Sequence, residues 1–374
     1  MGMGENAIRP ETRCNLQDTF MADEMKAAVL YGKEDVRLER VPVPEAGAGE
    51  IVVRVASALT CGTDLKVFRR GYHKKMLLPP APFGHEMAGI VSDVGAGVTQ
   101  FRKGDRVVAI NSAPCGECYF CRRQQENLCD NLLFNNGAYA EYMRIPARIV
   151  AKNTLLVPEH VSLDHAAMTE PLACVLQAMD ETDVQPGDQM AVIGAGSIGL
   201  MFMHVAALKN IDVIAVVKHA GQVDLARSFG ARQVVLTTET EDVIGAVRTL
   251  TPNGRGADAV IEAVALPMTW LWAVDMVRKG GVVNFFGGCA AGTKVEIDTN
   301  RLHYNNITLR ASFHHRPSVC SRAFEWIASG RFQSDKFLTG RAPLEELVQV
   351  FRRLMNRTDD IKIAIHPGAS SHGC

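Results

Sequence analysis

Four cysteines of this chain have the spacing of a metal site. Cys115-Gly-Glu-Cys118-Tyr-Phe-Cys121 is followed by seven residues and then by Cys129. Four thiolates are the usual donors of a closed, tetrahedral zinc site, so we predict that they hold a structural Zn²⁺. A ferredoxin-type iron–sulfur run has a different spacing and a proline after its last cysteine. A DNA-binding zinc finger is also disfavoured, because no basic helix accompanies the cysteines.

A second set of metal-binding residue types is dispersed along the chain. Cys61, His85 and Glu170 offer sulfur, nitrogen and oxygen. A catalytic Zn²⁺ takes three protein ligands and keeps one open position, and this set would provide them. Glu86 is a candidate fourth ligand that alternates with water, and Asp64 is a candidate to orient His85. Taken singly, these residues could equally be a buried thiol, a structural histidine and an acid at a helix N-terminus.

A glycine motif predicts a dinucleotide site. Gly194-Ala-Gly196-Ser197-Ile198-Gly199 follows the apolar run 190–193 and precedes a helical pattern. In that context the glycines make a tight turn, admit a pyrophosphate and pack helix on strand. Packing glycines alone are the alternative. Gly287-Gly288, after a later apolar run, would let the backbone lie against the nicotinamide end of such a cofactor.

The residue after the second strand of this unit bears on which cofactor is bound. An enzyme that uses NAD usually has an acidic residue there, to hold the ribose 2′-hydroxyl. The run 213–217 ends instead in Lys218. A cation at this place would suit a 2′-phosphate, so we favour NADP over NAD. The alternative is a lysine that is merely solvated at a strand end.

Other residues are candidates for the substrate cleft. His314 and His315 follow the last predicted strand of the nucleotide unit, and a polar seam between domains is the alternative reading. Further pocket candidates are Phe68, Tyr72, Phe134 and Asn135.

The elements that must position these residues fall into two patterns. Up to about residue 150, short β-branched runs alternate with Gly and Pro turns, as in 25–31 and 50–56. From 163–179 onward, helical runs alternate with apolar strands up to 281–286. This alternation predicts an α/β fold with a doubly wound parallel sheet. Two helices, near 319–328 and 344–355, and a strand at 361–365 complete the chain.

Length and composition exclude several classes of protein. The chain has 374 residues, which suggests two domains, and 47% are hydrophobic, too many for disorder. Its formal net charge of −1 argues against a nucleic-acid-binding surface. The apolar stretch 190–208 contains the glycine motif, so we predict a buried strand, turn and helix rather than a membrane span.

The N-terminal segment predicts a cytoplasmic protein. Residues 1–24 mix charges with no apolar core, unlike a secretory signal, and are expected to form a loose extension. Met21 and Met25 are alternative starts. Ten cysteines in a cytosolic chain are metal ligands or buried thiols more often than disulfides.

These motifs together resemble the zinc-dependent medium-chain dehydrogenase/reductase family. The resemblance covers residues 25–367, and the motifs occur in the order that is typical of the family. They are Gly84-His-Glu86 with Gly89, Gly104-Asp-Arg-Val107, the four-cysteine lobe and the glycine motif. Glu170-Pro-Leu172 is similar to the polyol (sorbitol) and threonine dehydrogenase branch.

The resemblance implies a domain organisation. After the extension 1–24, a GroES-like, mostly β catalytic domain would take 25–175, a Rossmann domain would take 176–316, and 317–374 would complete the catalytic domain. A dimer or tetramer is expected on the same ground.

The resemblance also implies roles for individual residues. Cys61, His85 and Glu170 would bind catalytic zinc, and Glu86 would be an additional ligand. Thr63 would pass on the substrate proton. Lys66 stands where many relatives have the outer histidine of the proton relay.

The expected reaction is hydride transfer between a secondary alcohol and NAD(P). The substrate class is a polyol, cyclitol or amino-polyol, and the enzyme would carry two Zn²⁺ per chain, with Thr63 and Lys66 in the proton relay. Three alternatives are a zinc-free type of quinone or enone reductase, a non-catalytic NADP-binding regulator, and a lyase or epimerase that transfers hydride transiently.

Overall fold

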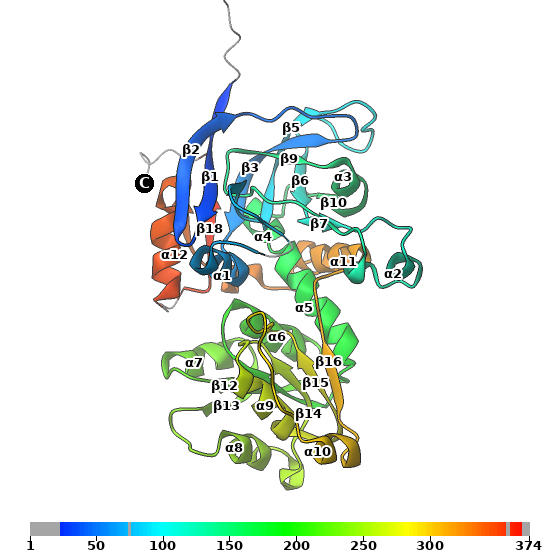
Figure 1. Ribbon diagram of the computed structural model, residues 1–374, viewed down its shortest axis with the longest axis vertical. Coiled ribbons are helices and arrows are strands. Elements are labelled where there is room, and N and C mark those ends of the chain that lie inside the picture. The colour runs from blue at the N-terminus through cyan, green and yellow to red at the C-terminus, as the bar shows by residue number, and fades with distance from the viewer. Residues whose placement is uncertain (1–22, 74–75, 357–359, 369–374) are drawn as a thin grey trace, which may run out of the picture.

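The computed structural model describes residues 23–73, 76–356 and 360–368. Most of the predicted extension, residues 1–22 with Met21, lies outside these ranges. The described chain has two halves, one built from both ends of the sequence and one from its middle (Figure 1).

The first half is mostly β, as predicted. Its main sheet has the order β10-β6-β5-β3-β18-β17, and β9 pairs with β3. The last strand of the chain, β18, lies antiparallel to β3, which joins the two ends of the sequence in one sheet. The strands of this half are β1 (Glu24–Gly32), β2 (Asp35–Pro42), β3 (Ile51–Leu59), β4 (Ala81–Pro82), β5 (Met87–Val94), β6 (Arg106–Ala109), β7 (Ser112–Ala113), β8 (Leu133–Phe134), β9 (Tyr142–Ile145), β10 (Thr154–Leu156), β17 (Leu338–Pro343) and β18 (Lys362–His366). Its helices are α1 (Gly62–Arg70), α2 (Tyr119–Arg122), α3 (Ala147–Asn153), α4 (Leu163–Ala166), α11 (Pro317–Ala328) and α12 (Leu347–Met355).

The second half is a doubly wound parallel sheet. The strand order β13-β12-β11-β14-β15-β16 is that of a dinucleotide-binding Rossmann fold. Its strands are β11 (Gln189–Ile193), β12 (Asp212–Val217), β13 (Ala231–Leu236), β14 (Ala257–Glu262), β15 (Val277–Phe285) and β16 (Thr308–Ala311). The helices of this half are α6 (Ser197–Leu208), α7 (Gly221–Ser228), α8 (Val243–Thr249), α9 (Pro267–Met276) and α10 (Thr299–Tyr304).

Helix α5 (Thr169–Thr182) connects the two halves (Figure 1). One hydrophobic cluster continues from Leu59 and Val108 of the first half, through Leu172 and Leu176 of α5, to Met190 of the second. The segment 163–179, which we predicted to be helical, forms two consecutive helices, α4 and then α5. Pro171 lies in the first turn of α5, where the missing N–H costs no intrahelical bond.

The apolar stretch 190–208 is a buried strand, turn and helix, as predicted. It forms the end of β11, the glycine turn and α6. In the described part of the chain, no helix is long and apolar enough to span a membrane.

Candidate active site

Three donors of the dispersed set converge at the ends of two neighbouring strands. Cys61 follows β3 and caps the N-terminus of α1, where its Sγ accepts from the backbone N–H of Thr63 at 3.4 Å. His85 and Glu86 directly precede β5, the strand that pairs with β3. One ligand atom from each of Cys61, His85 and Glu86 lies within 4.8 Å of the others.

Asp64 orients His85, as predicted. His85 Nδ1 lies 2.9 Å from Asp64 Oδ1, which leaves Nε2 as the ring nitrogen available to a metal. Burial lowers the pKa of His85, but Asp64 and Cys61 raise it by more, so that it lies well above its usual value. Tyr139 Oη in turn donates to Asp64 Oδ2 at 2.7 Å. Asp64 is therefore fixed on both of its oxygens.

Glu86 has a partner that the sequence analysis missed. Lys362 Nζ lies 2.8 Å from Glu86 Oε1 and 2.6 Å from Oε2, and it donates to Thr60 O at 2.9 Å. Both side chains are almost fully buried. A lysine within the apolar run 361–365 was a signal for such a pair, because lysine is rarely buried without one.

Glu170 lies in a different group of donors. Its Oε1 is 3.8 Å from His315 Nε2 and accepts from the Cys174 thiol at 3.8 Å. Ligand atoms of Glu170, Cys174, His314 and His315 all lie within 4.8 Å of one another. Burial raises the pKa of Glu170 to about 7, although the nearby charge of His85 lowers it. That Glu170 shares an ion with Cys61 and His85 stays a prediction.

The first donor set fits a divalent zinc ion. It offers three protein donors, one sulfur, one nitrogen and one oxygen, and a catalytic zinc takes three protein ligands and keeps one position open. Burial raises the pKa of both the Cys61 thiol and the Glu86 carboxyl. A bound dication would compensate that cost by stabilising the ionised forms.

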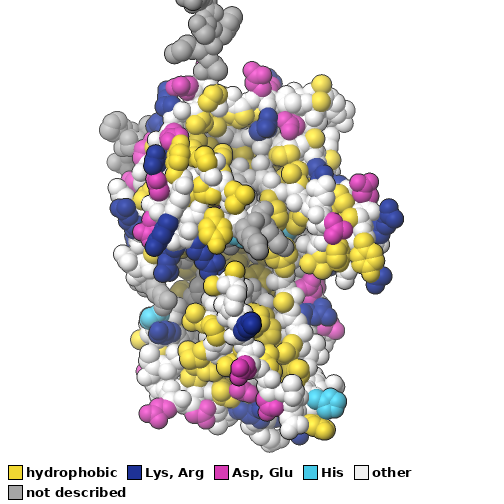
Figure 2. Space-filling view, in the orientation of Figure 1, with side chains coloured by type: hydrophobic (Ala, Val, Ile, Leu, Met, Phe, Trp, Pro, Cys, Tyr) yellow, Lys and Arg dark blue, Asp and Glu magenta, His cyan; other side chains and the backbone are white. Residues whose placement is uncertain are grey.

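The four-cysteine lobe has the geometry of a structural zinc site. Four of the Sγ–Sγ distances among Cys115, Cys118, Cys121 and Cys129 run from 3.5 to 3.9 Å. A tetrahedron with Zn–S bonds of about 2.3 Å requires about 3.8 Å between sulfurs. Backbone N–H groups of Glu117 and Cys118 lower the pKa of the Cys115 thiol to about 6, which favours the thiolate. The lobe, around α2, projects from the first half (Figures 1 and 2).

The glycine motif forms the expected turn between β11 and α6. Gly194 has φ +102°, a conformation that favours glycine, and a Cβ on Gly199 would lie 2.0 Å from Gly194 O. A Cβ on Gly196, by contrast, would meet nothing within 4 Å. Gly196 caps α6, so open space lies at a helix N-terminus, where a pyrophosphate would fit. Ser197 and Ile198 begin the helix.

The other predicted cofactor residues lie at the same edge of the parallel sheet. Lys218 directly follows β12 and is exposed. Gly287 follows β15, and a Cβ there would lie 2.5 Å from Glu262 Oε2, whereas Gly288 faces open space. The sequence analysis did not identify Glu262, which is the last residue of β14. Its side chain is fully buried, and its Oε2 has no hydrogen-bond partner within the described residues.

Lys66, on the first half of the chain, lies close enough to these loops to act on their charges. Burial raises the pKa values of Glu262 and Cys289, and the Lys66 ammonium opposes both shifts. Lys66 is exposed on α1, and Thr63 lines a small hollow together with His85 and Asp64.

The residues that we predicted to line the substrate pocket lie in different environments. Phe68 is a wrong prediction, because it is 1% exposed and its ring packs 5.6 Å from that of Phe351 in the core. Phe134 packs against the His314 ring at 5.2 Å. Tyr72 is exposed, and Asn135 donates to Arg144 O.

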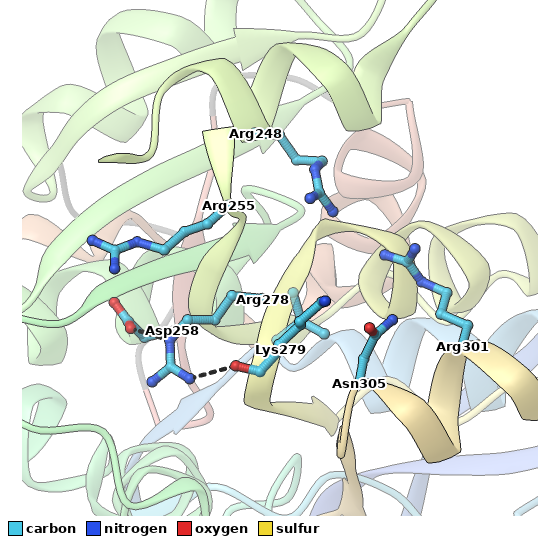
Figure 3. A pocket seen from close by; sticks show the side chains of 8 residues that line it. Arg248, Arg255, Asp258, Arg278, Lys279, Arg301 and Asn305 are labelled. Atoms are coloured by element: carbon cyan, nitrogen blue, oxygen red, sulfur yellow. Dashed lines mark hydrogen bonds and ion pairs between the residues drawn. The ribbon is translucent and has the colours of Figure 1, made fainter. Parts of the chain in front are cut away.

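A hollow of about 700 Å³ lies elsewhere, at the start of β14 and β15 (Figure 3). The glycine turn follows the end of β11, so the two lie at opposite edges of the parallel sheet. Arg248 and Arg301 in this hollow both donate to the Asp275 carbonyl near the end of α9, and Arg278 pairs with Asp258. These cations have structural partners, and the hollow is not part of the candidate site.

The sequence matches two families in the order that the fold requires. Residues 47–159 match the alcohol dehydrogenase GroES-like domain, and residues 197–329 match the zinc-binding dehydrogenase family. An L-threonine 3-dehydrogenase of Bacillus licheniformis is 31% identical over 93% of this chain and 100% of its own length. The chain belongs to the zinc-dependent medium-chain alcohol dehydrogenase family.

Other members of the family are similar over most of their length. A sorbitol dehydrogenase of Bacillus subtilis is 27% identical over 92% of this chain and 97% of its own. Among solved structures, a protein of Sinorhizobium meliloti bound to NADP superposes with a TM-score of 0.84 at 29% identity, covering 92% of this chain and all of that one. Membership in this family makes the chain a zinc-dependent, NAD(P)-dependent alcohol oxidoreductase with a GroES-like and a Rossmann domain.

Proposed function

We propose that the enzyme oxidises a secondary alcohol of a polyol, cyclitol or amino-polyol reversibly, with NADP as the preferred cofactor. The observation that carries the proposal is the convergence of Cys61, His85 and Glu86, on the half of the chain that faces the glycine turn. Relatives named for sorbitol, threonine and arabitol phosphate support this substrate class. The proposed units are residues 25–175 and 317–374 for the catalytic domain and 176–316 for the Rossmann domain.

Zinc would be held by Cys61, His85 and Glu170, with Glu86 as a further ligand that alternates with water. When bound, Zn²⁺ supplies Lewis acidity that lowers the pKa of an alcohol, and the nicotinamide accepts the hydride. Asp64 holds the His85 ring in one orientation. Lys362 holds the Glu86 carboxylate by both oxygens, so Glu86 contacts an ion only if it gives up part of this pair.

Thr63 is the proposed first proton acceptor. It begins α1 beside Cys61 and lines the hollow next to His85. Lys66, one turn further along α1, faces the cleft and would take the place of the outer relay group. Lys218 would hold the 2′-phosphate of NADP, and Gly287 and Gly288 would border the nicotinamide.

A reduction assay tests the proposal. Reduced nicotinamide would be followed by its near-ultraviolet absorbance with NAD⁺ or NADP⁺, against polyols, cyclitols, amino-polyols, threonine and simple secondary alcohols, with and without a zinc chelator. We expect chelator-sensitive reduction of NADP⁺ by one polyol class. Reduction of NAD⁺ alone would reject the role of Lys218, and chelator-resistant turnover would reject the zinc mechanism.

The Cys61→Ser variant tests the donor set. We expect turnover to fall by at least about 100-fold, because the variant loses the thiolate donor of the catalytic ion. The melting temperature should stay close to that of the wild type. Cys289→Ser, a cysteine outside the three donor groups, is the control. Activity of Cys61→Ser equal to that of the control would reject the assignment.

Assembly as a dimer or tetramer is a further proposal, carried by the family resemblance. A cytoplasmic location is proposed as well, from the sequence composition alone. Nucleic acid is not a proposed partner.

A further inference from the structure

The hollow at the start of β14 and β15 is rich in cations (Figure 3). Five of its eight lining residues are basic, and one is acidic. The basic residues are Arg248, Arg255, Arg278, Lys279 and Arg301. Because the whole chain has a formal net charge of −1, this excess of positive charge is a local feature.

Carboxylates neutralise only two of the five cations. Arg278 Nε lies 2.5 Å from Asp258 Oδ1, and Arg301 Nε lies 2.7 Å from Asp275 Oδ1. The other three cations have no ion pair within the residues that the structure describes. Three positive charges of the hollow therefore have no counter-charge in the described chain.

One carbonyl oxygen holds two of the guanidinium groups next to each other. Arg248 Nη1 and Arg301 Nη2 donate to Asp275 O at 3.3 and 2.8 Å. A carbonyl has no net charge, so it does not offset the repulsion between the two cations. A guanidinium has five N–H donors, and most of those on Arg248 and Arg301 remain without a partner in the described chain. An anion between the two groups would supply both the charge and the acceptors.

Side chains from different elements point into the same space. Figure 3 shows four of them around it: Arg248, Lys279, Arg301 and Asn305. They come from the last turn of α8, from β15, from α10 and from the residue that caps α10. Charged and amide donors that surround one space suit an oxyanion, whose oxygens accept from several directions.

A structural role explains part of this cluster. A cation near the end of a helix is favourable, and Arg248 and Arg301 reach a carbonyl near the end of α9. Arg255 and Lys279 have no such role. Both are exposed, and neither side chain has a hydrogen bond or an ion pair among the described residues. The helix end therefore does not account for the whole cluster.

We propose that this hollow binds a small molecule that carries a diphosphate group or two neighbouring phosphates. Arginine suits phosphate because its planar fork forms paired hydrogen bonds with two oxygens. A volume of about 700 Å³ is within the range of small-molecule sites and leaves room for more than the phosphates. The hollow lies at the edge of the parallel sheet opposite to the glycine turn, so this site goes beyond the proposed function.

Calorimetric titration with inorganic pyrophosphate tests the site. The full-length holoenzyme would first be saturated with NADP⁺, so that the glycine turn and Lys218 are occupied. We expect one equivalent of pyrophosphate to bind per chain, with an affinity that falls as the NaCl concentration rises, because salt screens exposed charges. A wild type that binds no pyrophosphate would overturn the proposal.

Two variants assign the binding to the hollow. Arg248→Gln should raise the Kd for pyrophosphate by about 10-fold or more, as expected for the loss of a hydrogen-bonded charge. Arg255→Gln should raise it as well and keep the melting temperature of the wild type, since Arg255 is exposed and has no side-chain partner within the described residues. Arg310→Gln, at an exposed arginine of β16 outside the hollow, is the matched control. Equal Kd values in all three variants would overturn the site, because pyrophosphate would then bind elsewhere, for instance to zinc.

ADP separates two sources of a diphosphate. If ADP binds to the NADP⁺-saturated enzyme more tightly than pyrophosphate, and Arg248→Gln weakens both, the hollow takes a nucleoside diphosphate. If the two bind equally and both are weakened, the hollow recognises the diphosphate alone. Either result supports the anion site. Loss of the site would leave the proposed function intact, because the reduction of NADP⁺ by an alcohol is measured independently.

Discussion

At the residue scale, the pair of Lys362 and Glu86 shows how the site is held. The two side chains come from β18 and from the residue before β5, 276 positions apart, and they are almost fully buried. A buried ion pair adds little to stability, but removing one partner leaves a charge without compensation. Here the ion pair fixes the orientation of the Glu86 carboxylate, which lies among the metal donors.

Lys362→Met therefore should lower the free energy of unfolding by about 3 kcal/mol, because Glu86 is left buried without its cation. Urea denaturation of the holoenzyme measures this loss. Lys362→Arg should recover part of it. Lys279→Met, at an exposed lysine, is the control, and a loss in Lys362→Met no larger than in the control would contradict the prediction.

At the scale of elements, the four-cysteine lobe depends on its sulfurs. It contains only the short helix α2, a 3₁₀ turn and loops, so it has little core of its own. Structural zinc contributes directly to the folding of such segments. Asn127 of the lobe donates to Phe313 O, next to His314, which links the lobe to the segment that follows β16.

We expect Cys118→Ser to lose one zinc equivalent and to lower thermal stability by several degrees. The rate of the chemical step, measured in single turnovers, should change much less. Cys289→Ser is the matched control, since Cys289 lies outside the donor groups. A variant with the stability of the control but little activity would indicate a catalytic role for the lobe instead.

Asp164 ties three elements of the first half together. It lies on α4, and its Oδ2 accepts from Arg341 of β17 at 2.8 Å while its Oδ1 lies 2.8 Å from His366 of β18. Burial raises the pKa of Asp164, but its contacts with His366 and Arg341 lower it by more, so it lies below its usual range.

Because the folded pKa of Asp164 is depressed, its contribution to stability is present above the unfolded pKa of about 3.9 and is lost as the pH falls through the folded value. Asp164→Asn should cost about 1–3 kcal/mol at pH 7, as expected for hydrogen bonds to a charged group. Urea denaturation from neutral pH down to about 5 should show this cost unchanged, with the decline only below that. If the loss of unfolding free energy in Asp164→Asn became smaller between neutral pH and about 5, the depressed pKa of Asp164 would be contradicted.

At the scale of the whole molecule, cofactor binding and folding stability are linked. The glycine turn, Lys218 and Gly288 lie on the Rossmann half, and Lys66 faces them from the other half. The hydrophobic cluster that runs through α5 makes the two halves one continuous core. Ligand bound to the cleft should therefore stabilise the folded chain as a unit.

We expect NADP⁺ to raise the melting temperature more than NAD⁺ at the same concentration. At a concentration 100 times the Kd the stabilisation is about 2.7 kcal/mol. Lys218→Ala should abolish the difference between the two cofactors, and Lys279→Met should preserve it. If NADP⁺ and NAD⁺ raised the melting temperature of the wild type equally, Lys218 would be only a solvated lysine at the end of a strand.

The sequence by itself determined the chemistry and the class of fold. The spacing of the four cysteines, the glycine turn between a strand and a helix, and the β-to-α/β change of pattern are local, and local periodicity and turn chemistry determine them. The tertiary structure decided which donors meet. Lys362 reaches Glu86, and Glu170 lies with His314 and His315, because strands and helices far apart in sequence pack together. Such contacts depend on global packing, which no local spacing encodes.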